Sequence, residues 1–204
     1  MVNEKLEILR LLIENRSSDF TIRQIALKRK INYKSAYNNI WTLKDEGVVS
    51  LTEYGNSTIC RFNYSFNESV FSVEKQRLYD LLRRKDFQVL YDSLCSINSQ
   101  FMMLLFGSYV KKTESKNSDI DLLLISDYPK VVESQISLLP LKIHLTSITY
   151  KEFLAMFRSK EFSVVSEAVK FNIPLIGVED YYRLIKNAQQ TKPHEDDSIL
   201  LSSK

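Results

Sequence analysis

The stretch FMMLLFGS (residues 101–108), followed after ten residues by DIDLLLI (residues 119–125), decides how this chain folds. Residues 101–106 form a short, continuously apolar run, which is typical of a buried strand. Gly107 and Ser108 then predict a tight turn, because glycine places no side chain on the backbone. A short helix that starts at Ser108 presents free backbone N–H groups and the positive end of its dipole, and both suit phosphate oxygens. The first half of the stretch therefore predicts a phosphate-binding turn.

The second half of the stretch supplies negative charge. Side chains on a strand alternate between its two faces, so Asp119 and Asp121 point one way while Ile120, Leu122 and Leu124 point the other. Two carboxylates on one face need a cation, and such hard oxygen ligands suit Mg²⁺ or Mn²⁺. Magnesium held by carboxylates and substrate phosphates is common in phosphoryl-transfer sites. The pair therefore predicts a metal site near the turn.

Gly-Ser, ten residues and Asp-x-Asp, each attached to an apolar strand, resemble a known signature. It belongs to the nucleotidyltransferase superfamily that shares the DNA polymerase β palm, and in particular to its minimal nucleotidyltransferases. The resemblance covers about residues 90–185. It implies an NTP substrate, expected to be ATP, and metal ions bound by the two aspartates. It also implies that the triphosphate contacts Gly107, Ser108 and Lys111. The alternative is coincidence, in which Ser108 caps a helix and the aspartates flank a turn.

A strand predicted at residues 141–148 occupies the place where this family carries a third carboxylate, and here that place is taken by His144. Three roles stay open for this residue. His144 is a neutral metal ligand that favours Mn²⁺, or a general base near neutral pH. The third role is a residue beside the metal ligands, in a site that binds nucleotide but transfers the nucleotidyl group poorly. Glu152 is the obvious substitute acid, but its spacing from Thr149 predicts a capping box. We therefore group His144 with the two aspartates as a candidate catalytic residue.

Residues 1–65 predict three helices and a hairpin. The second helix starts at a capping box at Thr21, the third starts at Asn32, and Gly47 ends it. Two β-prone runs follow, joined at Gly55-Asn56. This order resembles a winged helix-turn-helix domain, which implies that the third helix lies in the major groove of DNA. The residues implied in nucleic-acid contact are Lys34, Ser35, Tyr37 and Asn38, with Arg23 and Lys30 near phosphates.

Charge supports this view only in part. Residues 1–65 hold ten Lys and Arg against seven Asp and Glu, a surplus equal to the net charge of +3 of the whole chain. Basic residues in the second and third helices without an intervening acid indicate the beginning of a phosphate-facing patch. Winged helices also serve in dimerisation and protein docking, and a charged helix face is often only solvated. A homodimer and a protein partner therefore stay open.

The predicted fold class is α+β, with a mixed sheet flanked by helices in the nucleotidyltransferase domain. We expect a winged helix at residues 1–65, a linker and packing helices at 66–99, the nucleotidyltransferase domain at 100–188 and a mobile tail at 189–204. Within 66–99, we expect a packed linker at 66–73 and helices from Glu74 to about Ser99.

The composition limits the classes of protein to which this chain can belong. The chain has 204 residues, of which 44% are hydrophobic, so it has enough apolar residues for a core. Its two cysteines, Cys60 and Cys95, show neither pairing nor metal spacing, which predicts buried thiols in a reducing compartment. No apolar run of 18 residues and no signal-peptide pattern occurs, so we expect a cytoplasmic protein without a membrane span.

Two functions follow from the residues and the resemblances. The first is a metal-dependent enzyme that moves a nucleoside monophosphate from an NTP to an acceptor hydroxyl on a protein, an RNA or a small molecule. Similar minimal nucleotidyltransferases act as antitoxins that modify a partner toxin, so a cognate toxin is one expected partner. The alternative is a DNA-binding transcriptional regulator whose degenerate nucleotidyltransferase domain senses nucleotide.

Overall fold

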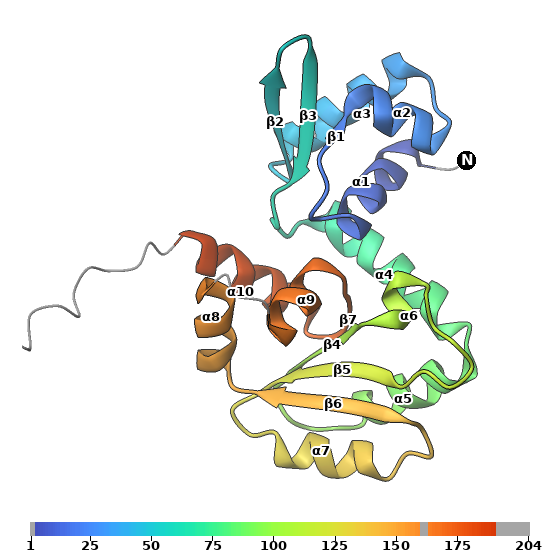
Figure 1. Ribbon diagram of the computed structural model, residues 1–204, viewed down its shortest axis with the longest axis vertical. Helices are drawn as coiled ribbons and strands as arrows, with labels where there is room; N and C mark the ends of the chain where they lie inside the picture. Colours follow the sequence, from blue (N-terminus) through green and yellow to red (C-terminus); the bar gives the residue numbers. More distant parts are fainter. Residues whose placement is uncertain (1–2, 160–162, 191–204) are drawn as a thin grey trace, which may run out of the picture.

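The computed structural model describes residues 3–159 and 163–190. Figure 1 shows an N-terminal unit (residues 3–64) and a C-terminal unit (residues 85–190), connected by the long helix α4 (Glu68–Leu82). Within the described ranges, no helix is long and apolar enough to span a membrane.

The N-terminal unit consists of three helices and a small antiparallel sheet. Its helices are α1 (Glu4–Glu14), α2 (Ile22–Arg29) and α3 (Tyr33–Asp45), and its strands are β1 (Phe20–Thr21), β2 (Val49–Tyr54) and β3 (Ser57–Phe62). The capping box of Thr21 with Gln24 and the cap at Asn32 are both present, as predicted. The strand order is β1-β3-β2. Strand β1 was not predicted, because two residues are too short to show a period.

The expected linker at residues 66–73 is mostly helical. Asn67 accepts a hydrogen bond from the Val70 backbone N–H at 2.9 Å and starts α4 six residues earlier than the predicted Glu74. Val70 and Val73 are fully buried, so this first part of the helix belongs to the core. Helix α5 (Lys85–Cys95) follows after a short break, so the helices expected from Glu74 to about Ser99 are present and end at Cys95.

A four-stranded mixed sheet organises the C-terminal unit. Its strands are β4 (Met102–Phe106), β5 (Ile120–Ile125), β6 (Ile143–Ile148) and β7 (Ile173–Ile176), in the order β6-β5-β4-β7. Strands β5 and β6 are parallel, and the other neighbours are antiparallel. The helices are α6 (Ser108–Lys111), α7 (Lys130–Ser137), α8 (Tyr150–Ser159), α9 (Val164–Lys170) and α10 (Val178–Gln190). This mixed α+β arrangement agrees with the predicted fold class for this unit.

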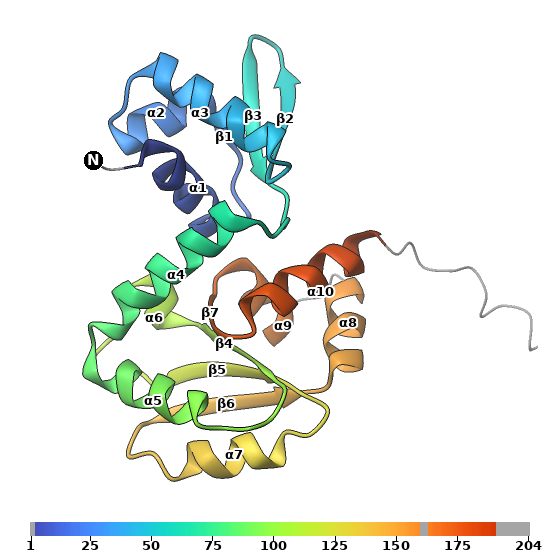
Figure 2. The same cartoon turned by 180° about the vertical axis from the view of Figure 1, so that it is seen from behind.

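Helices cover both faces of this sheet. Helices α5 and α7 lie on one face, and α8, α9 and α10 lie on the other (Figures 1 and 2). Leu122 and Leu124 pack with α5 and α7, whereas Leu123 and Ile125 belong to the opposite core. The predicted alternation along β5 is therefore present, and it places Asp121 on the side of α8–α10.

A buried polar junction connects the two units through α4. Arg16, which follows α1, is paired with Glu74 of α4 at 2.8 Å and donates a hydrogen bond to the Tyr182 hydroxyl of α10 at 2.7 Å. The side chains of Arg16 and Glu74 are only 1% and 3% exposed. Arg77 also pairs with Glu74 and donates to the Asn172 carbonyl at 2.7 Å. The junction therefore fixes the N-terminal unit against α4 and α10.

Two sequence predictions need correction. Cys60 is fully buried, and burial raises the pKa of its thiol to about 12, but Cys95 is exposed at the end of α5. The run of apolar residues before Cys95 does not bury it, because its position lies off the stripe formed by Phe87, Leu90 and Leu94. Residues 189 and 190, predicted to belong to a mobile tail, are part of α10, and residues 191–204 lie outside the described ranges.

Candidate functional site

The turn after β4 has the backbone that the sequence predicts. Gly107 has φ +73° and ψ −148°, a combination that residues with a Cβ atom rarely adopt. Helix α6 starts directly afterwards at Ser108, and the Lys111 N–H donates to the Gly107 carbonyl at 3.2 Å. The backbone N–H groups at the start of α6 therefore have the arrangement expected of a phosphate-binding turn.

Gly107 also makes room for a carboxylate. Phe106 of β4 lies opposite Asp121 of β5, and this register brings the turn and the aspartate together. A Cβ atom at Gly107 would lie 2.1 Å from Asp121 Oδ2, far inside van der Waals contact. The sequence suggests glycine here for the approach of phosphate, whereas the structure adds that only glycine leaves the Asp121 carboxylate in place.

His144 lies beside Asp121 because β5 and β6 pair in parallel with these two residues in register. Its Nδ1 atom is 3.2 Å from Asp121 Oδ1, and its side chain is 65% exposed. A proton on Nδ1 makes this contact a hydrogen bond to the carboxylate and leaves Nε2 with a free lone pair. His144 is therefore placed to orient Asp121 and to offer a second nitrogen to substrate or cation.

Asp119 and Asp121 fit a magnesium-type site that is completed by substrate. Asp119 is exposed immediately before β5, two residues from Asp121 and so on the same face. In the described ranges, no group of three or more His, Cys, Asp or Glu side chains is arranged to hold a metal ion. Magnesium requires fewer protein ligands where phosphates and water complete its octahedron. The open pair and the space that Gly107 leaves for Asp121 are compatible with that chemistry.

Lys111 is directed toward α9. Its ammonium is 2.5 Å from Glu167 Oε1 and 5.8 Å from the centre of the Phe171 ring. Glu167 was not expected at the site, because it is 56 residues away in sequence and no local pattern connects the two positions. Without a ligand, Lys111 is therefore engaged by a carboxylate on the neighbouring helix.

Glu152 has the structural role that the sequence predicts. Its Oε2 accepts hydrogen bonds from the Thr149 backbone N–H at 2.7 Å and from the Thr149 hydroxyl at 2.9 Å. The Glu152 N–H donates back to Thr149 Oγ1 at 3.2 Å. These bonds lower the pKa of the Glu152 carboxyl, backbone hydrogen bonding being the main cause. Glu152 therefore stabilises the start of α8 by capping and is not available as a substitute third acid.

Five of the six residues suggested for nucleic-acid contact are exposed on α2, α3 and the turn between them: Arg23, Lys30, Lys34, Tyr37 and Asn38. Across the described ranges, none of the three cations among them forms an ion pair. Ser35 differs, because it is only half-exposed and its hydroxyl donates to a carboxylate oxygen of Glu4 in α1. Ser35 therefore stabilises the packing of α3 on α1 and lies apart from the exposed face.

Comparison with known proteins adds a family to this geometry. The family described as "Nucleotidyltransferase domain" matches residues 88–202, which is more than half of the chain. No curated protein and no solved structure gives a significant match. The matched region includes the turn at Gly107, both aspartates and His144. The chain therefore belongs to the nucleotidyltransferase domain family.

Proposed function

We propose that this protein is a metal-dependent nucleotidyltransferase, which moves a nucleoside monophosphate from an NTP, expected to be ATP, to an acceptor hydroxyl. The contact between the turn and Asp121 supports this proposal most directly. A glycine whose missing side chain leaves space for a carboxylate joins the predicted phosphate site and the predicted cation site in one place. Family membership supports the general class of reaction.

In the proposed reaction, an oxygen of the acceptor hydroxyl forms a bond to the α-phosphorus. The bond from that phosphorus to the bridging oxygen breaks, and pyrophosphate leaves. The N–H groups after Gly107 and the Ser108 hydroxyl bind the triphosphate, and Lys111 exchanges Glu167 for a phosphate oxygen. The acceptor proton passes to a base, for which His144 Nε2 is one candidate.

Asp119 and Asp121 are the residues that would hold Mg²⁺ or Mn²⁺. A divalent cation bound there supplies positive charge that offsets the charge of the phosphates. His144 hydrogen-bonds Asp121 and keeps its carboxylate oriented toward the turn, as neighbours of metal ligands commonly do.

The acceptor is proposed by chemistry class. The site at Asp119 and His144 is open, since both side chains are exposed, and this favours a macromolecular hydroxyl on a protein or an RNA end over a fully enclosed small molecule. A cognate toxin, as in antitoxin-like nucleotidyltransferases, is one such protein. The expected cytoplasmic location is compatible with each of these acceptors.

The test is incubation of purified protein with each α-³²P-labelled NTP and either Mg²⁺ or Mn²⁺. Label transfer is scored on the protein itself, on added RNA and on co-purifying protein. Transfer that the Asp119→Ala/Asp121→Ala double substitution abolishes supports the proposal. A wild-type protein that binds NTP but labels no acceptor contradicts it.

A second function is favoured by the exposed cationic face of the N-terminal unit. We infer that residues 1–65 are a winged helix-turn-helix domain that binds DNA through Lys34, Tyr37 and Asn38, with Arg23 and Lys30 near phosphates. Three unpaired cations and an exposed tyrosine on adjacent helices support this inference. A regulator whose nucleotidyltransferase domain only senses nucleotide binds DNA in a gel-shift assay while transferring no label.

A further inference from the structure

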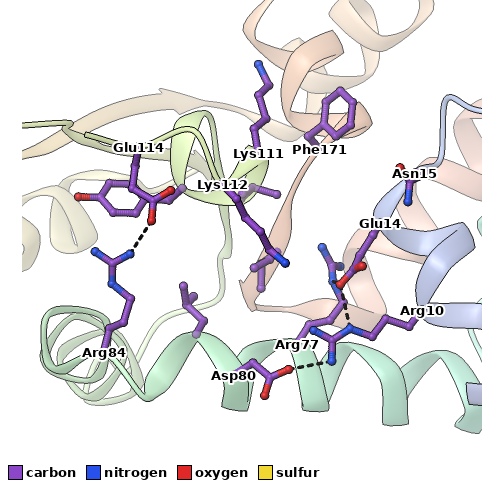
Figure 3. Close-up of a pocket in the computed structure, with 14 residues that line it drawn as sticks. Arg10, Glu14, Asn15, Arg77, Asp80, Arg84, Lys111, Lys112, Glu114 and Phe171 are labelled. Atoms are coloured by element: carbon purple, nitrogen blue, oxygen red, sulfur yellow. Dashed lines mark hydrogen bonds and ion pairs between the residues drawn. The ribbon is translucent and has the colours of Figure 1, made fainter. Parts of the chain in front are cut away.

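A cavity of about 680 Å³ lies between the N-terminal unit, α4 and the segment that follows α6. Figure 3 shows its lining side chains, which come from α1, α4, residues 109–114 and the start of β7. Its volume falls in the range of small-molecule sites, roughly 300–1,000 Å³. Asp119, Asp121 and His144 do not line it, whereas Lys111, proposed above to contact the triphosphate, does. The cavity therefore adjoins the proposed catalytic site without including its carboxylates.

Five cationic side chains line this cavity, from α1, α4, the junction of α4 and α5, and the end of α6: Arg10, Arg77, Arg84, Lys111 and Lys112. The arginines are held in place by carboxylates, as in the pairs Arg10–Asp80 at 2.7 Å and Arg84–Glu114 at 2.9 Å. Lys112 forms no ion pair within the described part of the chain. Figure 3 shows it extending from the end of α6 toward Arg10 and Arg77, whereas Lys111 points away. The lining therefore holds one lysine without an ion pair, beside guanidinium groups that carboxylates fix in position.

The backbone at Lys112 decides which residues this position tolerates. Lys112 caps α6 with φ +57°, a left-handed conformation that costs a residue with a Cβ atom about 1 kcal/mol. Lys30 ends α2 in the same conformation, which is a common way for a helix to end. Glycine or asparagine is the usual residue at such a position, so asparagine is the suitable substitution for removing the Lys112 charge.

Planar and apolar groups form other parts of the lining. Phe171 is half-buried beside α9, and the Tyr109 ring lies under the Arg84 guanidinium at 4.8 Å. Leu81 and Val110 contribute aliphatic surface. Aromatic and aliphatic surfaces next to cations suit a ligand with a flat ring and a phosphate, because aromatic groups stack on nucleobases and guanidinium or ammonium groups bind phosphate.

We propose that this cavity binds a nucleoside phosphate independently of the catalytic carboxylates. The phosphate contacts Lys112 and those guanidinium N–H groups of Arg10 that do not hydrogen-bond to Glu14 or Asp80. The base contacts Phe171. Because residues 109–112 line the cavity and directly follow the Gly107–Ser108 turn, an occupied cavity restricts the position of that turn. Binding itself does not depend on the proposed function, whereas the effect on transfer does.

The test measures binding of AMP and of inorganic phosphate by calorimetry in EDTA, which removes divalent cations. The proteins are the wild type, Asp119→Asn/Asp121→Asn, Lys112→Asn, Phe171→Leu and the matched control Lys116→Asn. Lys116 is an exposed lysine of the same loop outside the cavity. Asparagine tolerates the left-handed backbone of position 112, so this variant is expected to fold, and its melting temperature checks that.

We expect AMP to bind the wild type, the double aspartate variant and Lys116→Asn equally well, and to bind Lys112→Asn at least tenfold more weakly. Phe171→Leu is expected to weaken the binding of AMP but not the binding of inorganic phosphate.

Absence of AMP binding to the wild type overturns the proposal. So does AMP binding that the aspartate substitutions abolish and Lys112→Asn leaves intact, because the nucleotide then occupies only the catalytic site. Equal binding of AMP and phosphate with no effect of Phe171→Leu overturns the nucleoside part. Failure of the proposed catalytic function appears separately, in the label-transfer assay.

Discussion

At the scale of single residues, Gly107 is constrained by its own backbone and by its neighbour Asp121. Alanine at this position is expected to lower label transfer about 100-fold, because its Cβ displaces the Asp121 carboxylate and a displacement of about 1 Å has an effect of that size. Its backbone, with φ +73° and ψ −148°, is a region that only glycine adopts readily, so alanine also adds about 1–3 kcal/mol of destabilisation. The measurements are the transfer rate and the free energy of unfolding.

Gly47 is the matched control for this substitution. It has the same φ of +73°, but nothing lies within 4 Å of a Cβ atom built there. Gly47→Ala is therefore expected to lose stability from its positive φ alone and to keep transfer. Equal loss of transfer in both variants would show that instability, rather than the position of Asp121, is the cause.

His144 is expected to set the choice of metal ion. An imidazole ligand or neighbour favours Mn²⁺ relative to a site built from carboxylates alone. His144→Asp is therefore expected to raise the ratio of the transfer rate with Mg²⁺ to the rate with Mn²⁺, and His144→Ala to lower both rates about 10–100-fold. Lys142→Ala is the control, since Lys142 is exposed directly before β6 and two residues from His144. Unchanged rates and metal preference in both His144 variants would remove this residue from the site.

At the scale of elements, Glu46 joins the end of α3 to α1 and α4. Its carboxylate is 2.5 Å from Lys5 Nζ and accepts a hydrogen bond from the Ser69 hydroxyl at 2.8 Å. Burial alone would raise the pKa of Glu46, but the hydrogen bonds from Lys5 and Ser69 and the charge of Lys5 outweigh burial and lower it. The three helices are therefore held together best when Glu46 is ionised.

The consequence is a dependence of stability on pH. Because the folded pKa is below the unfolded value of about 4.3, the stabilisation is complete above that value and is lost as the pH falls through the folded pKa. Glu46→Gln is expected to cost about 1 kcal/mol at pH 7 and progressively less below about pH 4. Urea unfolding from pH 7 to pH 3 measures this, with Glu53→Gln at an exposed position of β2 as the control. A difference that does not shrink in acid would exclude the carboxylate as its cause.

Elements with a local signal were predictable. The caps at Thr21 and Asn32 and the apolar run before Gly107 depend on neighbours within a few residues, and the structure confirms them. Strand β1 was not predicted because it exists only through its pairing with β3. The early start of α4 was missed because the Asn67 cap was interpreted as part of a linker.

Only the part of the candidate site that lies within the Gly-Ser and Asp-x-Asp motif was predictable. The spacing of Gly107 and the aspartates identifies the turn and the carboxylates. The partner of Lys111, the place of Ser35 and the lining of the cavity depend on contacts between distant segments, which a single sequence does not reveal. The clash that a side chain at Gly107 would cause depends on the register of two strands and was equally hidden.

At the scale of the whole molecule, one apolar core extends through both units. It includes Ile8 and Leu43 of the N-terminal unit together with Leu104 and Tyr182 of the C-terminal unit. The Arg16–Glu74 junction lies beside it. Unfolding is therefore expected to occur as one cooperative transition rather than as two.

Arg16→Ala tests how much this junction contributes to the free energy of unfolding. Arg16→Ala removes one of the two buried cations that pair with Glu74, Arg77 being the other, and it removes the hydrogen bond to the Tyr182 hydroxyl. The loss is expected to cost about 3 kcal/mol. Arg61→Ala breaks an ion pair with Asp19 whose side chains are 54% and 46% exposed, and it is expected to cost much less than Arg16→Ala because solvent screens the pair. Chemical denaturation followed by circular dichroism compares the two. Similar costs in both variants would mean that the junction contributes no more than a surface pair.

The same junction constrains how this chain can diverge. Tyr181 and Tyr182 are fully buried, and burial raises the pKa of both hydroxyls, so they remain uncharged donors and acceptors under the N-terminal unit. A homologue that lost residues 1–65 would expose both rings together with Glu74. Shorter descendants are therefore expected to show small or polar residues at positions 181 and 182, and to change position 74 in the same lineages.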